Sequence, residues 1–225
     1  MSDLICSNYS LLMVLSRFGL PLGFGDKTVK EVCAQHEVDC NTFLAVVNFV
    51  EEDRSSLDDE GDGVSVVSLM SYLKRAHVYF LDFNLPAIRR KLIEAIDCSS
   101  SNEVAFLILK FFDEYAAEVR KHMDYEDKVV FAYVEALLRK EADLPPYQIS
   151  IFARRHDQIE AKLTELKNII IKYYPAKRDT NLLNAVLFDI YNCEADLAMH
   201  CKVEDYMFIP VVRKLEREVK GNEKQ

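Results

Sequence analysis

Four of the five histidines fall in four separate segments of the second part of the chain, and two of them begin the same short motif. His122 lies four residues before Glu126, and His200 lies four residues before Glu204. In a helix, this spacing places an imidazole and a carboxylate on one face, about one turn apart. A single helix can then offer a nitrogen ligand and an oxygen ligand to the same metal ion. The pattern therefore predicts metal binding.

The other two histidines complete an internal repeat. His77 precedes His122 by 45 residues, and His156 precedes His200 by 44. Each half of this region contains a single histidine followed by His-x-x-x-Glu, so two helical hairpins would bring two imidazoles and one carboxylate each to a common centre. Such a mixed set in a helical bundle favours a pair of iron or manganese ions over tetrahedral zinc.

Acidic residues near these motifs are candidates to support the ligands. Glu118 and Asp196 each precede a motif histidine by four residues, and we expect them to accept a hydrogen bond from the imidazole. A solvated charge at a helix edge is the alternative for both. Glu160 follows His156 by four residues and is a candidate extra ligand. Cys201, directly after a motif histidine, is expected to pack as a small apolar side chain.

All four histidines share a helical face with apolar residues, which predicts that they point into the core. The stripe through His122, for example, carries Phe111, Tyr115, Val119, Val129, Val130 and Tyr133. Burying a carboxylate on such a stripe costs several kcal/mol unless it is paired or bound to a metal. A helical scaffold without metal is the alternative hypothesis, and the two motif glutamates argue against it.

Four long amphipathic segments must position these residues. They are predicted as helices over approximately residues 65–96, 103–140, 148–174 and 180–219. The breaks between them are short, so neighbouring helices should run antiparallel. The sequence therefore predicts an all-α fold with an up-down-up-down four-helix bundle over residues 65–225. Pro86 is expected to kink the first of these helices or to end its first half.

The preceding part of the chain has a different composition. Residues 1–53 are predicted to form a small helical domain of three helices, at Asn8–Phe18, Lys27–Gln35 and Thr42–Glu52, with Asp26 and Asn41 as N-caps. Residues 54–64 are acidic and contain Gly and Ser, so we expect a linker.

Composition excludes several classes of function. The formal net charge of -9 argues against a nucleic-acid-binding surface. No apolar stretch approaches the roughly 20 residues that cross a bilayer, and the first residues lack the features of a secretory signal, so no membrane association and a cytoplasmic location are expected. The six cysteines form no Cys-x-x-Cys pair, which is typical of reduced thiols.

With this His and Glu set in a four-helix bundle, the chain resembles the hemerythrin-like di-iron proteins called Repair of Iron Centres proteins. The resemblance rests on the six candidate ligands and on Glu204 followed six residues later by Pro210. It also rests on Asn8–Thr28, which is similar to the small helical domain that precedes the bundle in that family. Gly23 and Phe24 stand where family members often carry adjacent cysteines.

The resemblance implies two iron ions in an oxo-bridged di-iron site with two histidines on each iron and two bridging carboxylates. The ligands that it implies are His77, His122, Glu126, His156, His200 and Glu204. The implied function is repair of iron-sulfur clusters damaged by oxidants or nitric oxide, through iron donation or through reaction with NO, O2 or peroxide. Damaged iron-sulfur proteins would then be the clients of a monomer or homodimer that is not a conventional enzyme. The alternative is a di-iron sensor or regulator without catalytic turnover.

Overall fold

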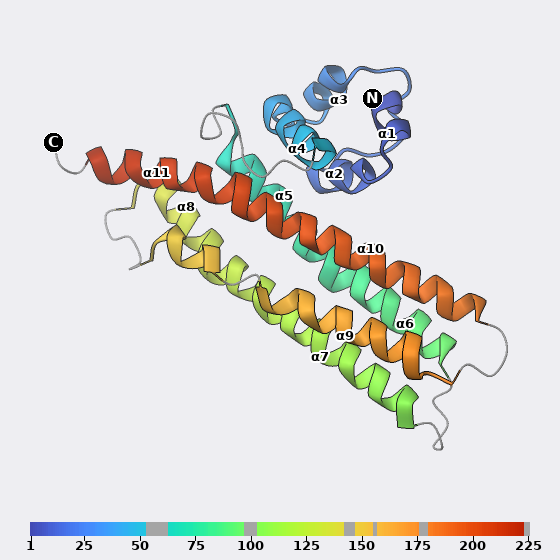
Figure 1. The fold of residues 1–225 in the computed structure, drawn as a ribbon. Helices are drawn as coiled ribbons and strands as arrows, with labels where there is room; N and C mark the ends of the chain where they lie inside the picture. The colour runs from blue at the N-terminus through green and yellow to red at the C-terminus, as the bar shows by residue number, and fades with distance from the viewer. Residues whose placement is uncertain (53–62, 97–102, 142–146, 155–156, 176–179, 223–225) are drawn as a thin grey trace. The chain divides into compact units, whose positions relative to one another are not determined.

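The described part of the chain is helical, as the sequence predicted. The computed structural model describes residues 1–52, 63–96, 103–141, 147–154, 157–175 and 180–222, and their side chains except those at 52, 153–154, 157–161 and 220–222. Figure 1 shows these elements as coiled ribbons, and no strand occurs among the described residues. The all-α class is therefore confirmed. Most of the predicted linker, residues 54–64, lies outside the described residues.

Four short helices form the first part of the chain. They are α1 (Ser2–Ser7), α2 (Leu11–Phe18), α3 (Val29–Gln35) and α4 (Cys40–Glu52). Helices α2 to α4 agree with the three predicted helices to within a few residues. Helix α1 was not predicted, because it has no buried residue and therefore no apolar periodicity.

The N-caps of the short helices differ from the predicted ones. Thr28, not Asp26, caps α3: its Oγ1 accepts a hydrogen bond from the Glu31 N–H, and the Glu31 carboxylate accepts one from the Thr28 N–H. This reciprocal capping box satisfies two backbone donors at once, which a lone Asp26 would not do. At the start of α4, the Asp39 carboxylate accepts from the Thr42 N–H at 2.7 Å.

Three long helical runs follow, and each contains a π-helical turn. The runs are α5 (Val66–Val78), η2 (Tyr79–Asn84) and α6 (Leu85–Ala95); α7 (Glu103–Tyr125), η3 (Glu126–Phe131) and α8 (Ala132–Leu138); and α10 (Asn181–Val203), η5 (Glu204–Phe208) and α11 (Ile209–Asn222). Between the last two lie the 3-10 turn η4 (Ile149–Arg154) and α9 (Asp157–Tyr173). Pro86 does not end its run, because it lies in the first turn of α6, where its missing N–H costs least.

The chain divides into two compact units, and each contains segments of all the long helical runs. One unit comprises residues 1–76, 130–153 and 199–225, and the other comprises residues 77–129 and 154–198. These units do not follow the predicted limits of 1–53 and 65–225, so those limits stay a prediction.

The unit of residues 77–129 and 154–198 contains α6, α7, α9 and most of α10. Helix α7 packs against α6 on one side and α9 on the other. Ion pairs connect α10 to its neighbours: Lys91 Nζ on α6 lies 2.6 Å from an Asp189 oxygen, and Lys167 on α9 pairs with Glu194. Its core includes Ile88, Leu92, Ile108, Phe112, Leu166, Ile170, Val186 and Ile190. These four helices form the bundle arrangement that the segment spacing predicted.

The other unit contains the short helices, the start of the first long run and the ends of the other two. The Phe18 ring lies 5.3 Å from the Phe43 ring and 5.1 Å from that of Tyr72, so α2, α4 and α5 share one aromatic core. Near α11, the Glu216 carboxylate accepts a 2.6 Å hydrogen bond from the Tyr133 hydroxyl. The same oxygen accepts from the Ile149 N–H at 3.1 Å, which ties α8, η4 and α11 together.

Candidate metal centre

The two His-x-x-x-Glu motifs have the same local structure. His122 lies in the last turn of α7 and Glu126 is the first residue of the π-helical turn η3. His200 lies in the last turn of α10 and Glu204 is the first residue of the π-helical turn η5. Single π-helical turns occur frequently at functional sites, because the extra residue redirects the side chains around it. The repeat in the sequence is therefore also a repeat in local structure.

In the first motif, one carboxylate contacts two imidazoles. Oε1 of Glu126 lies 2.7 Å from Nε2 of His122, and Oε2 lies 3.1 Å from Nε2 of His77. The Glu126 side chain is fully buried, and His77 and His122 retain only 2% and 10% of their side-chain exposure. Each oxygen of Glu126 therefore has its own histidine neighbour, as in a carboxylate that could contribute one oxygen to each of two metal ions.

The second motif is just as deeply buried. Nε2 of His200 lies 3.3 Å from Oε1 of Glu204, and neither side chain has any exposure to solvent. Fully buried apolar residues lie within the second motif and directly after it: Val203, Met207 and Phe208. The prediction that these motif residues point into the core agrees with this burial.

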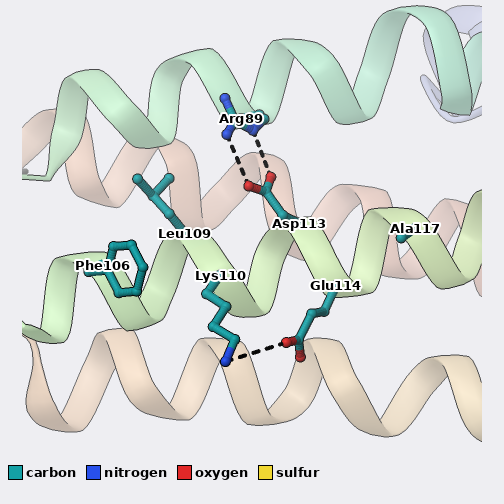
Figure 2. Close-up of a pocket in the computed structure, with 7 residues that line it drawn as sticks. All are labelled: Arg89, Phe106, Leu109, Lys110, Asp113, Glu114 and Ala117. Atoms are coloured by element: carbon teal, nitrogen blue, oxygen red, sulfur yellow. Dashed lines mark hydrogen bonds and ion pairs between the residues drawn. The ribbon is translucent and has the colours of Figure 1, made fainter.

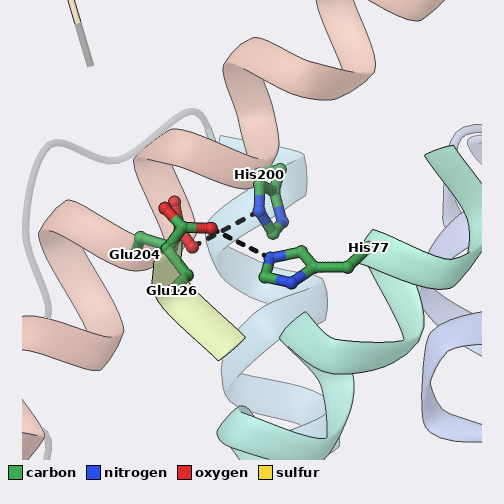
Figure 3. A group of neighbouring side chains, drawn as sticks. All are labelled: His77, Glu126, His200 and Glu204. Carbon is green, nitrogen blue, oxygen red and sulfur yellow. Dashed lines mark ion pairs between the residues drawn. The ribbon is translucent and has the colours of Figure 1, made fainter. Parts of the chain in front are cut away.

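Four buried side chains form a group that could hold a metal ion within the described part of the chain. They are His77, Glu126, His200 and Glu204, and each offers one ligand atom, with all four atoms within 4.8 Å of one another. Figure 3 shows the two imidazoles and two carboxylates pointing toward one another. Two nitrogen and two oxygen donors of this kind suit iron or manganese in a helical bundle. The residues present therefore fit a metal ion.

The remaining predicted ligands have different positions. His122 is not one of the group of four, but its contact with Glu126 places it beside the group. His156 lies outside the described residues, and so does the side chain of Glu160. Their predicted roles as ligands stay predictions.

The predicted supporting acids lie as follows. Glu118 has an exposed side chain, and its Oε1 lies 3.9 Å from Nζ of Lys162. Asp196 is half-buried on α10.

Two cysteines of α10 are buried. Burial, followed by the charges of Asp196 and Glu194, raises the pKa of the Cys193 thiol to about 12. Cys201 is also buried, with only 8% of its surface exposed, which agrees with the expected packing as a small apolar side chain.

One acidic residue at this site was not predicted from the sequence. Asp127 directly follows Glu126, and its Oδ1 lies 3.0 Å from Nδ1 of His77. The repeat contained an indication of it, because Asp205 follows Glu204 in the same way. On a regular helix, adjacent residues point about 100° apart, so the periodicity gave no reason to place both Glu126 and Asp127 near one histidine.

A separate surface pocket lies between α6 and α7. It has a volume of about 500 Å³ and contains none of the candidate metal ligands. Figure 2 shows that its charged side chains pair with one another: the Arg89 guanidinium donates to both Asp113 oxygens at 2.6 and 2.9 Å, and Lys110 lies 3.9 Å from Glu114. Asp113 also raises the pKa of Arg89. Since these pairs are exposed and mutually satisfied, the pocket is not the candidate site.

Comparison with known proteins identifies the family. Residues 68–212 match the family described as the hemerythrin HHE cation binding domain, which is more than half of the chain. The chain therefore belongs to the hemerythrin HHE cation-binding family, and its buried His and Glu group lies in a metal-binding helical domain. No curated protein and no solved structure matches the chain. Within the described residues, every helix is too short or too polar to cross a membrane.

Proposed function

We propose that this hemerythrin domain holds two iron ions and that the protein takes part in repairing iron-sulfur clusters damaged by oxidants or nitric oxide. The observation that carries the proposal is the convergence of His77, Glu126, His200 and Glu204, four buried side chains with ligand atoms within 4.8 Å of one another. Burying two carboxylates together is costly unless positive charge offsets them. A metal cation supplies that charge, and the family of the domain is named for cation binding.

Glu126 supports a site for two ions rather than one. Its two oxygens contact different imidazoles, His122 at 2.7 Å and His77 at 3.1 Å. A carboxylate that is split in this way has the arrangement of a bridging ligand. Glu204 occupies the equivalent position in the second motif, and His156 would complete the set of four histidines.

The protein's own residues control access to this centre. Val119, Met123 and Phe131, which lie before, within and after the first motif, are at most 1% exposed. Together with the apolar residues after His200, they exclude bulk water, which strengthens the interaction of the carboxylates with a cation. Bound iron would supply one-electron chemistry and open positions for NO, O2 or peroxide. Iron held by few protein ligands could also be released to a damaged cluster.

The test uses a hydratase whose iron-sulfur cluster has been damaged by nitric oxide. The full-length protein, loaded with iron, should restore hydratase activity faster than the same amount of free ferrous ion. The Glu126→Gln and Glu204→Gln variants should restore hydratase activity no faster than free ferrous ion does. Glu165→Gln, at an exposed position of α9, should restore it as fast as the unmodified protein. Equal restoration by all four proteins and by free iron would contradict the proposed repair function.

A further inference from the structure

His77 lies between two carboxylates that come from consecutive residues of a neighbouring helical run. Its Nε2 is 3.1 Å from Oε2 of Glu126, and its Nδ1 is 3.0 Å from Oδ1 of Asp127. Glu126 is fully buried, whereas the Asp127 side chain is 42% exposed. The two ring nitrogens therefore have different surroundings. Nε2 faces the buried His and Glu group, and Nδ1 faces a carboxylate at its edge.

The π-helical turn η3 accompanies this arrangement. Side chains of consecutive helical residues point in different directions, so two adjacent acids cannot ordinarily reach the same atom. Glu126 and Asp127 contact different atoms of one imidazole: Glu126 reaches Nε2 of His77, and Asp127 reaches Nδ1 on the other side of the ring. Both acids lie at the start of the π-helical turn η3, which begins at Glu126. The imidazole of His77 is thus fixed in orientation by one helical run.

The other acids near the first motif have lysine partners. Asp124 lies 2.8 Å from Nζ of Lys128, which lowers the pKa of Asp124, and Glu118 faces Lys162 at 3.9 Å. Asp127 differs from both because its contact is with an imidazole nitrogen. A carboxylate that orients a metal-binding histidine in this way is a common feature of metal sites.

A neutral His77 can donate to only one of its two carboxylate neighbours, Asp127 at Nδ1 or Glu126 at Nε2, and that choice decides which nitrogen carries the proton. An ionised carboxylate can only accept hydrogen bonds, and a neutral imidazole has a single N–H. If Nδ1 donates to Asp127, then Nε2 presents its lone pair to the buried group. We propose that Asp127 is a positioning residue that holds His77 with its proton on Nδ1, so that Nε2 is available to the metal ion. This inference rests on the proposed metal-binding function.

The test measures the tautomer of His77 and the affinity for ferrous iron separately. Long-range proton-nitrogen NMR correlations on the full chain, labelled with ¹⁵N-histidine and free of metal, distinguish the two tautomers. Ferrous iron is then titrated under anaerobic conditions. The variants are Asp127→Asn, which removes the charge, and Asp127→Glu, which keeps it. The control is Asp113→Asn on α7. It removes the same charge from an aspartate whose partner is Arg89 rather than a histidine.

We expect His77 to carry its proton on Nδ1 in the unmodified protein and in Asp113→Asn. Asp127→Asn should shift the proton toward Nε2 and weaken iron binding by about 10- to 100-fold. Asp127→Glu should retain the Nδ1 tautomer and most of the iron affinity. If Asp127→Asn does not fold, Asp127→Ala, which also removes the carboxylate, replaces it as the decisive variant.

Two results would overturn the inference in distinguishable ways. An unchanged tautomer and iron affinity in Asp127→Asn, with normal binding by the unmodified protein, would refute the role of Asp127 and leave the proposed function intact. Absence of iron binding by the unmodified protein would refute the proposed function, and the inference with it.

Discussion

Replacing Glu126 by Gln should make the metal-free protein more stable and abolish its stabilisation by iron. Gln has nearly the shape of Glu and can still hydrogen-bond to His77 and His122, which lie 3.1 and 2.7 Å from the carboxylate oxygens. The substitution removes a negative charge from a side chain with no solvent exposure. Because desolvating such a charge often costs more than its partners return, we expect a gain of about 1–3 kcal/mol in the free energy of unfolding.

Thermal and urea unfolding with chelator and with ferrous iron would measure this effect. For a chain of this length, each kcal/mol changes Tm by about 2–4 °C, so the metal-free variant should melt a few to about 12 °C higher. Iron should raise the Tm of the unmodified protein and leave that of the variant unchanged. The free energy of unfolding of the exposed control Glu165→Gln should differ from that of the unmodified protein by less than about 0.5 kcal/mol. A loss of more than about 2 kcal/mol in metal-free Glu126→Gln would refute the reasoning, because the carboxylate would then be a structural partner of the imidazoles.

Three further predictions concern positions away from the metal group. Tyr133→Phe removes the 2.6 Å hydrogen bond to Glu216 and should lower the free energy of unfolding by about 1–2 kcal/mol in urea titrations. Gly19→Ala should lower the free energy of unfolding by about 1–2 kcal/mol in thermal unfolding, because φ at Gly19 is +72° and the new Cβ would collide with the Arg75 guanidinium. Cys193 should resist iodoacetamide at pH 9 while exposed Cys6 reacts, as mass spectrometry would show, because burial raises the pKa of Cys193 from 9.0 to about 12. The unfolded chain loses this proton first, so the thiol's contribution to stability should fall as pH rises from 9.0 toward 12.

The sequence predicted the helical class and the buried motif residues because both depend on local periodicity. The spacing of His122 and Glu126, repeated at His200 and Glu204, places side chains on one helical face without any knowledge of tertiary structure. Apolar neighbours on the same faces then predicted burial, and three of these four residues are fully or almost fully buried. The family match over residues 68–212 agrees with that prediction.

The π-helical turns could not be predicted in this way. A regular helix would place Val129 on the buried stripe with Val130, but Val129 is 37% exposed. The turn η3, Glu126–Phe131, contains an extra residue, which changes the direction of the side chains that follow. The same change in direction accompanies the contact of Asp127 with His77, so this residue was also missed.

Metal analysis of the purified protein, together with its visible absorption spectrum, tests the central claim most directly. The comparison is with the double variant Glu126→Ala, Glu204→Ala. We predict about two irons per unmodified chain with absorption bands from ligand-to-iron charge transfer, and loss of both the iron and the bands in the variant. No bound metal, or metal retained equally by the variant, would contradict the claim that the buried His and Glu group is a metal centre.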